Sequence, residues 1–206
     1  EFRMIKLVFD KIFAFFALIF LTPVFIIVAL LIKINSPDGP VFYKQRRIGK
    51  DNRYFYCYKF RTMVVNADEK LQKLLSSDIK FKNEYEESFK LKHDPRVIQG
   101  IGVFLRRTSL DEIPQFYNVL VGDMSVVGPR PIVYDEIQKY KKSFSKLISI
   151  RPGLTGFWQV NGRSDIDYRD RVAMDMEYID NSNIWLDIKI IFKTIKMMMT
   201  KNNGSY

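Results

Sequence analysis

Two adjacent carboxylates, Asp111 and Glu112, follow a pair of arginines and a pair of hydroxyl residues in the run Arg106-Arg107-Thr108-Ser109-Leu110-Asp111-Glu112-Ile113-Pro114. Neighbouring residues of a helix point about 100° apart, so these carboxylates can serve two purposes. One could attack a phosphorus atom while the other holds a divalent cation that offsets the repulsion between anions. Oxygen ligands shared with a phosphate favour Mg²⁺. The run therefore predicts phosphoryl-transfer chemistry.

The same run indicates the start of a helix. Pro114 lacks an amide proton and fits best in a first turn, with Ser109 or Asp111 as the cap. The backbone amides at such a start attract phosphate, and the two arginines bring further donors. A plain capping box formed by Ser109 and Glu112 is the alternative, in which Asp111 only adds dipole stabilisation. The run alone leaves both interpretations open.

A second candidate anion ligand is Arg130, which stands between two prolines in Val127-Gly128-Pro129-Arg130-Pro131. A rigid backbone means that Arg130 loses little freedom when it binds an anion. Exposure to solvent is the ordinary fate of an arginine and remains the alternative.

The third candidate is residues 151–163, which cluster glycines, hydrogen-bond donors and an indole in a loop with a short strand. Such a loop can approach a nucleotide closely, with Phe157 or Trp158 available to stack and Gln159 or Arg163 to hydrogen-bond. We expect at least one of the two aromatic rings to lie in the core.

The composition indicates one folded domain with an anionic partner. The chain has 206 residues, 47% of them apolar, and a formal charge of +10. This charge fits nucleic acid, acidic lipid or a phosphorylated substrate. A single cysteine, Cys57, and a single histidine, His93, exclude a disulfide framework and argue against a Cys/His zinc site. We expect Cys57 to be a small buried hydrophobic residue.

The segment from Ile12 to Ile32 carries no charge and is interrupted only by Thr22-Pro23. It is just long enough to cross a membrane, but the proline should kink the helix and Thr22 can bond a freed carbonyl. Basic residues flank both ends, which suits a hairpin whose ends share the cytoplasmic face. We therefore expect residues 1–35 to form a re-entrant membrane helix and 36–206 a catalytic domain. A kinked single-pass anchor is the alternative.

Residues 184–199 predict a C-terminal amphipathic helix, because Lys189, Lys193 and Lys196 share one helical face. Such a helix can lie in the lipid headgroup layer, although an ordinary packed terminal helix has the same pattern.

Between these segments the patterns predict an α+β fold that is mainly helical. Residues 41–43 and 54–60 read as two strands joined by a basic loop at 46–52, which makes a short β-hairpin. Residues 65–92 predict solvated helices. Residues 119–131 predict a helix end, a turn and a short apolar strand.

Six motifs in this order resemble the bacterial sugar transferase family, and in particular its monotopic phosphoglycosyl transferases. The resemblance covers essentially Lys6 to Met199. The motifs are Lys59-Phe60-Arg61-Thr62-Met63, Arg106 to Pro114, Gly122-Asp123-Met124-Ser125, Gly128-Pro129-Arg130-Pro131, Arg151-Pro152-Gly153-Leu154-Thr155-Gly156 and Leu186-Asp187-Ile188-Lys189.

The resemblance implies transfer of a sugar 1-phosphate from a UDP-sugar to undecaprenyl phosphate, with release of UMP. It implies Asp111 as the nucleophile that forms a phosphosugar-aspartyl intermediate, and Glu112 as the Mg²⁺-associated carboxylate. Thr22-Pro23 corresponds to the break of the family's re-entrant helix, where serine is commoner before the proline. The implied substrate-binding residues are Arg106, Arg130, Lys59, Arg61, Arg151, Thr155, Gln159 and Arg163.

Two segments, 89–96 and 157–160, resemble the hexose-1-phosphate branch that makes exopolysaccharide and O-antigen, so galactose or glucose is the expected sugar. Many members of that branch carry an extra membrane region before the catalytic part, and this chain is expected to be a short form or a piece of a longer protein. The implied location is the cytoplasmic face of the bacterial inner membrane. The expected partners are the donor, the lipid acceptor and the bilayer, without nucleic acid; a homodimer is compatible with the sequence.

Two alternatives remain from the sequence. A direct single displacement would proceed without a covalent intermediate. A membrane-anchored basic module that binds acidic lipid or nucleic acid would explain the charge, but it would leave the Asp111-Glu112 pair without a purpose.

Overall fold

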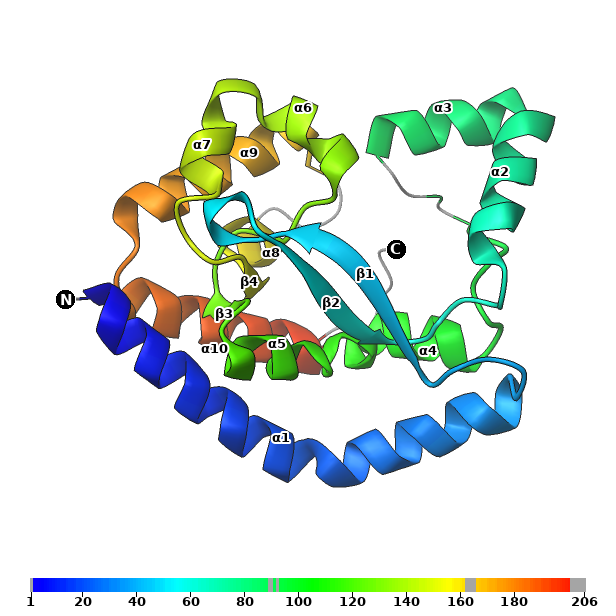
Figure 1. Ribbon diagram of the computed structural model, residues 1–206, viewed down its shortest axis with the longest axis horizontal. Helices are drawn as coiled ribbons and strands as arrows, with labels where there is room; N and C mark the ends of the chain where they lie inside the picture. Colours follow the sequence, from blue (N-terminus) through cyan, green and yellow to red (C-terminus); the bar gives the residue numbers. More distant parts are fainter. Residues whose placement is uncertain (1, 89–90, 92, 162–165, 201–206) are drawn as a thin grey trace.

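The longest element is one bent helix at the amino terminus. The computed structural model describes residues 2–88, 91, 93–161 and 166–200. Helix α1 (Phe2–Asn35) is continuous and contains Pro23. It bends near its middle and wraps around one side of the body, and both of its ends lie on the body's side of the bend (Figure 1). The predicted kinked helix is therefore present.

The hydroxyl before the proline bonds a different carbonyl from the predicted one. Pro23 cannot donate to the carbonyl of Ile19, four residues earlier. The Thr22 hydroxyl instead donates to the carbonyl oxygen of Leu18 at 2.8 Å, the carbonyl toward which the backbone N–H of Thr22 is directed in an α-helix. This back-bond adds to the bend without restoring the hydrogen bond that Pro23 removes.

Strands β1 (Phe42–Ile48) and β2 (Tyr54–Phe60) form an antiparallel hairpin, as predicted. The predicted extent of the connecting loop was wrong, because Arg46 and Arg47 belong to β1. The Arg46 guanidinium lies 3.9 Å from the centre of the Tyr54 ring, so the strand gains a cation–π contact. The loop itself is short and contains η1 (Lys50–Asn52).

The hairpin register places four polar or sulfur-bearing side chains on one face. Gln45 pairs with Cys57 and Arg47 with Phe55, while Lys59 lies two residues further along β2. Side chains alternate between the faces of a strand, so Gln45, Arg47, Cys57 and Lys59 share a face. Cys57 is 2% exposed, which confirms its expected role as a buried hydrophobic residue.

The charged middle of the chain forms α2 (Ala67–Ser77) and α3 (Ile79–Ser88), which confirms the predicted solvated helices. Helix α4 (Ile101–Thr108) follows, then the short turn η2 (Leu110–Glu112) and α5 (Gln115–Val121). Gly122 ends α5 with φ 94°, a left-handed conformation that glycine adopts readily.

A small parallel sheet joins the next two segments. Strand β3 (Ser125–Val127) pairs with β4 (Gly153–Thr155). The predicted helix end and short strand are thereby confirmed. A Cβ atom on Gly153 would lie 2.1 Å from the backbone nitrogen of Gly128, so only glycine fits this crossing. Between the strands lie η3 (Tyr134–Glu136), α6 (Ile137–Tyr140), η4 (Lys141–Ser143) and α7 (Phe144–Leu147).

In the described residues after β4 the helices are α8 (Phe157–Asn161), α9 (Tyr168–Asn181) and α10 (Ile184–Thr200). Residues 157–161 were predicted as loop and form a helical turn instead, because the indole of Trp158 is buried and the backbone closes on Gly156. The predicted C-terminal amphipathic helix is confirmed as α10. Its exposed surface includes Trp185, Phe192 and Met199.

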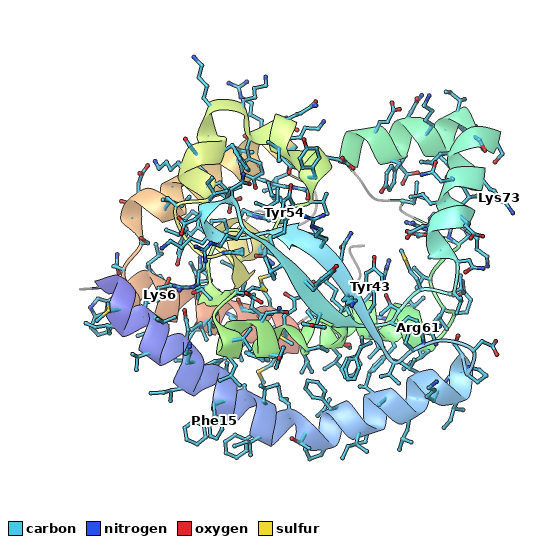
Figure 2. All side chains as sticks on the ribbon, viewed as in Figure 1. Lys6, Phe15, Tyr43, Tyr54, Arg61 and Lys73 are labelled. Carbon is cyan, nitrogen blue, oxygen red and sulfur yellow. The ribbon has the colours of Figure 1, made fainter. Side chains whose placement is uncertain are left out.

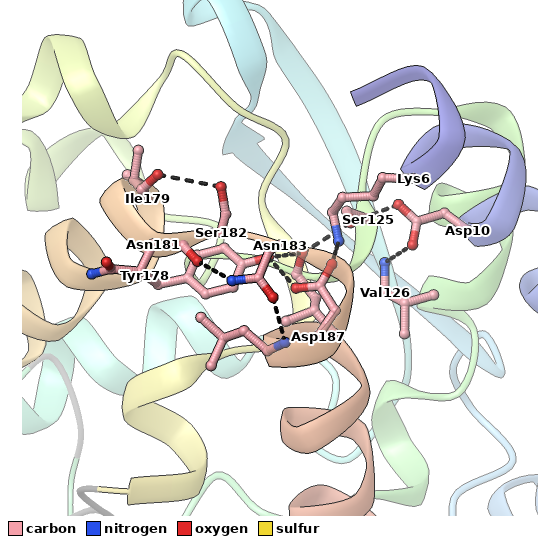
Figure 3. A network of polar contacts seen from close by, with 12 residues as sticks. Lys6, Asp10, Ser125, Val126, Tyr178, Ile179, Asn181, Ser182, Asn183 and Asp187 are labelled. Carbon is pink, nitrogen blue, oxygen red and sulfur yellow. Dashed lines mark hydrogen bonds and ion pairs between the residues drawn. The ribbon is translucent and has the colours of Figure 1, made fainter. Parts of the chain in front are cut away.

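Polar contacts fix the first half of α1 to the body (Figure 3). The ammonium of Lys6 lies 2.5 Å from Asp187 at the start of α10. Asp10 accepts hydrogen bonds from the Ser125 hydroxyl at 2.6 Å and from the Val126 N–H at 3.2 Å. Asp10 and Asp187 are 3% and 1% exposed, so these contacts are internal to the protein.

Apolar packing fixes the second half of α1. Val28 and Ile32 are buried in one cluster with Phe60 of β2 and Leu105 of α4. The apolar side chains on the opposite side of α1 are exposed. Phe15 points away from the body (Figure 2), and the exposed apolar side chains of α1 are Met4, Ile5, Val8, Ile12, Phe15, Phe16, Ile19, Phe20, Ile26, Ile27, Leu30, Leu31 and Ile34.

Candidate active site

Asp111 and Glu112 lie in the η2 turn between α4 and α5. Ser109 before the turn has φ 59°, a left-handed conformation that reverses the chain at the end of α4. Leu110 and Ile113 pack into the cluster under α1, which turns the two carboxylates toward the hairpin. The predicted helix start was wrong: Ser109 ends α4 and precedes only the η2 turn, and the next α-helix begins at Gln115, after Pro114. The capping box is wrong, because the Ser109 side chain makes no capping hydrogen bond.

Lys59 of β2 reaches the acidic turn from the hairpin. Its ammonium lies 2.6 Å from Oε1 of Glu112. The side chains of Lys59 and Glu112 are 22% and 32% exposed, so solvent still screens the pair. This contact places the acidic turn at the Lys59 end of the hairpin face described above.

Asp111 is only 8% exposed. Burial raises the pKa of its carboxyl from 3.8 to about 6. The charge of Lys59 lowers this pKa, Glu112 raises it and Arg106 lowers it. Asp111 is therefore largely ionised at neutral pH, while its partly desolvated carboxylate is well suited to attack an electrophile.

Arg106 lies in the last turn of α4, and its Nε donates to the Thr62 hydroxyl at 2.9 Å. The helix end and the buried Thr62 hold the guanidinium near Asp111, whose pKa it lowers. Lys59 and Arg106 thus bring two positive charges to the acidic turn, which suits a substrate that carries phosphate.

Three of the predicted substrate-binding residues take part in hydrogen bonds that join elements of the fold. Arg61 donates to the carbonyl oxygens of Ser36 and Pro40, both at 2.6 Å. Arg151 donates to the carbonyl oxygen of Gly122 at 2.7 Å. The Thr155 hydroxyl lies 2.8 Å from that of Thr194 in α10.

Gln159 is next to Trp158 in α8. Within the part of the chain that the structure describes, the buried Oε1 atom of Gln159 has no hydrogen-bond partner. Trp158 is 7% exposed, which confirms that at least one aromatic of this segment is buried. Arg163 lies outside the described residues.

A cavity of about 210 Å³ lies beside the hairpin, and Arg130 lines it together with Gln45 and Arg47 of β1. Arg47 is buried, and burial together with the charge of Arg130 lowers its pKa. Its Nη1 donates to the carbonyl oxygen of Pro131 at 2.9 Å and lies 3.5 Å from Glu136. Arg130 is therefore part of a charged pocket rather than a merely exposed side chain.

Sequence reasoning missed Arg47, Glu136 and Tyr168 as site residues. Arg47 was assigned to a loop, although its alternation with Gln45 along a strand would have placed both on the face of Cys57 and Lys59. No local sequence pattern marks Glu136 or Tyr168 as a site residue. The two are 32 residues apart in the chain and meet only in the fold, where the Tyr168 hydroxyl donates to Oε1 of Glu136 at 3.2 Å.

The acidic turn has a donor set that fits Mg²⁺. The described residues contain no group of three His, Cys, Asp or Glu side chains that could hold a metal by itself. Magnesium commonly uses one or two carboxylates together with substrate phosphates and water. Glu112 supplies one such carboxylate, so a diphosphate substrate and water would complete the ligand set.

Comparison with known proteins identifies the relatives of this arrangement. A family model described as bacterial sugar transferase matches residues 2–201. The chain is 46% identical over 204 residues to the undecaprenyl-phosphate galactose phosphotransferase of Salmonella typhimurium, covering 99% of this chain and 42% of that protein. It is 38% identical over 201 residues to the UDP-glucose:undecaprenyl-phosphate glucose-1-phosphate transferase of Escherichia coli, covering 94% and 40%.

A shorter relative matches along most of its length. The chain is 43% identical over 203 residues to the exopolysaccharide production protein ExoY of Rhizobium meliloti, covering 98% of this chain and 88% of that protein. The chain thus spans less than half of the two longer relatives and most of the shorter one.

Proposed function

Because the chain belongs to the bacterial sugar transferase family, we propose that it transfers a hexose 1-phosphate from a UDP-sugar to undecaprenyl phosphate and releases UMP. The observation that carries the proposal is the buried Asp111 carboxylate with Lys59 and Arg106 beside it. The named relatives act on galactose or glucose donors, and we propose one of these two hexoses as the sugar.

In the proposed first step, a carboxylate oxygen of Asp111 attacks the phosphorus that carries the sugar. The bond from that phosphorus to the bridging oxygen breaks, and UMP leaves with the electron pair. Lys59 and Arg106 stabilise the negative charge on the phosphate oxygens. The product of this step is a sugar phosphate esterified to Asp111.

In the second step, a phosphate oxygen of undecaprenyl phosphate attacks the same phosphorus. The bond to Asp111 breaks, its carboxylate is restored, and the lipid-linked diphosphate sugar is the product. The raised pKa of Asp111 supports the first step, because a poorly solvated carboxylate is a better nucleophile.

Glu112 would hold Mg²⁺ together with the donor diphosphate. When bound, the cation offsets the repulsion between the anionic nucleophile and the phosphates. Lys59 keeps Glu112 oriented toward this place through their contact at 2.6 Å.

We propose that α1 is a re-entrant helix, so that both of its ends lie at the cytoplasmic face of the inner membrane. Lys6 and Asp10 tie its first half to the body, and Val28 and Ile32 pack its second half onto the same body. A straight crossing would place the two ends on opposite sides of the bilayer, which conflicts with one body holding both. The bend, with Phe15 and Phe20 exposed, would enter the hydrocarbon.

An assay of UMP release tests the proposed function. The purified chain, in detergent with Mg²⁺ and undecaprenyl phosphate, would be given UDP-galactose, UDP-glucose and the two corresponding N-acetylhexosamine donors in turn. We expect UMP and a lipid-linked diphosphate sugar from one of the plain hexose donors. UMP release from none of the four would refute the proposal, and release only from an N-acetylated donor would refute the assigned sugar.

A further inference from the structure

The cavity beside the hairpin is charged, aromatic and small. Its walls include Arg47, Arg130, Glu136, Trp158 and Tyr168. Pockets that enclose a drug-sized ligand measure roughly 300–1,000 Å³. At about 210 Å³ this cavity fits one ring with its substituents and cannot enclose a whole nucleoside diphosphate sugar.

Glu136 is held rigidly at the wall of the cavity. Its Oε2 accepts a hydrogen bond from the Val133 N–H at 2.8 Å, and its Oε1 accepts one from the Tyr168 hydroxyl at 3.2 Å. Its side chain is only 13% exposed, and that of its ion-pair partner Arg47 is 9% exposed. A carboxylate offers about four lone-pair positions, so Glu136 retains acceptor capacity for a ligand hydroxyl.

The neighbouring groups suit a polyhydroxylated ring. The Tyr168 oxygen, whose hydrogen points to Glu136, can accept a hydrogen bond from a ligand hydroxyl. Trp158 adds an aromatic surface, with Arg171 5.1 Å from its ring centre. A carboxylate near a bound phosphate would be repulsive, whereas a carboxylate beside hydroxyl groups makes strong hydrogen bonds. The acid in this wall therefore favours hydroxyl groups as its ligand.

The cavity and the acidic turn lie along one face of the hairpin. Gln45 lines the cavity and pairs with Cys57, and Cys57 is two residues from Lys59, which contacts Glu112. Two residues of a strand span roughly 7 Å. The cavity wall and the acidic turn are therefore neighbours on this face, and the charge of Glu112 acts on Arg47 in the cavity wall.

The two proposed displacements determine which group of the donor can occupy the cavity. Both UMP and the lipid phosphate occupy the position opposite Asp111 on the same phosphorus, so the acceptor must be able to enter from the membrane after UMP leaves. The sugar stays bonded to the phosphorus in both steps. It must therefore lie to one side of the line that joins Asp111, the phosphorus and the departing or arriving phosphate. Helices α3, α6 and α9, which contribute cavity walls, lie on the side of the hairpin away from α1 (Figure 1).

We propose that this cavity binds the hexosyl group of the donor, and that Glu136 and Tyr168 select the hexose through its hydroxyl groups. This inference rests on the proposed transferase function. It gives the sugar a site of its own that remains occupied while UMP leaves and the lipid phosphate arrives.

The test compares two variants, Glu136→Gln and Tyr168→Phe, with wild type. The measurements are kcat/KM for UDP-glucose and UDP-galactose, which differ only in the orientation of one hydroxyl, and the inhibition constant of UMP. We expect each variant to change the ratio of the two kcat/KM values by about ten-fold or more, the effect of one lost hydrogen bond to a charged group. The inhibition constant of UMP should stay within about two-fold.

Glu177→Gln and Tyr134→Phe are matched controls, because both side chains are exposed and neither lines the cavity. An unchanged sugar ratio in both cavity variants would overturn the inference, since a merely structural loss lowers activity with both donors alike. Weaker UMP inhibition with an equal loss for both donors would assign the cavity to the nucleotide instead. If wild type releases no UMP from any UDP-sugar, the proposed function itself fails, which is a different result.

Discussion

Lys6 and Asp187 lie 181 positions apart in the chain and form an ion pair with 2.5 Å between Nζ and Oδ2. The Tyr178 hydroxyl donates to the other oxygen of Asp187 at 2.6 Å (Figure 3). The first turns of α1 are thereby joined to α10. The contact makes α1 part of the folded body rather than a detachable tether.

Removing the cation of this pair should destabilise the protein. Lys6→Met leaves the buried Asp187 carboxylate without its positive partner, and we expect a loss of about 3 kcal/mol in the free energy of unfolding. Denaturant unfolding in detergent measures the loss. Lys11→Met is the control, since Lys11 is exposed on the same helix. Equal stability of the two variants would contradict the structural role of the pair.

Labelling from one side of the membrane tests the re-entrant helix. Met4→Cys and Asp38→Cys place thiols at exposed positions at either end of α1, and the native Cys57 is 2% exposed and should stay unreactive. Both thiols should react with an impermeant maleimide on the same side of sealed vesicles. Phe20→Cys, at the exposed bend, should be protected by lipid. Labelling of Met4→Cys and Asp38→Cys from opposite sides would show a single-pass anchor.

Asp111→Asn should abolish turnover without unfolding the chain, because the amide cannot act as the nucleophile. Mass spectrometry of wild type with the UDP-sugar and no lipid acceptor should find one sugar phosphate on Asp111. Asp170→Asn, at an exposed position on α9, should retain activity. Normal product formation with an unmodified chain would instead support a direct displacement.

The rate should depend on pH through Asp111. The nucleophile must be ionised, and its pKa is about 6, so kcat/KM should rise with pH and level off above about 7. The charge of Lys59 lowers this pKa, so Lys59→Met should move the rise to higher pH. Arg53→Met, at an exposed position after the hairpin loop, should leave the midpoint in place. A Lys59→Met profile with an unchanged or lower midpoint would contradict this assignment.

Glu112 should govern the response to magnesium. Removal of divalent cations should stop UMP release by wild type, and added Mg²⁺ should restore it. Glu112→Gln loses a charged oxygen ligand, so we expect the Mg²⁺ concentration for half-maximal activity to rise at least about ten-fold. Glu177→Gln is the matched control. An unchanged Mg²⁺ requirement in Glu112→Gln would exclude this carboxylate as a ligand.

Local patterns predicted much of the fold. The proline in an apolar run indicated the bend of α1, and the glycine after Val121 indicated the end of α5. The aromatic run from Tyr54 to Phe60 indicated β2. Each of these features depends on a few neighbouring residues, whose backbone preferences are visible in the sequence.

Contacts between distant residues explain what the sequence did not reveal. Arg46 and Arg47 extend β1 because Tyr54 and Phe55 face them across the hairpin. Residues 157–161 became helical because Trp158 is buried against other elements. The acidic turn was visible as a motif, whereas its contact with Lys59 depends on the position of the hairpin, 53 residues away.

The fully buried Asn118 of α5 takes the place of a neighbouring strand along one edge of β2. Its Oδ1 accepts from the Tyr58 N–H at 3.0 Å, and its Nδ2 donates to the Tyr56 carbonyl oxygen at 2.7 Å. Open strand edges tend to recruit strands from other molecules. With these two backbone groups already paired, copies of the protein crowded on a bilayer lose one route to aggregation.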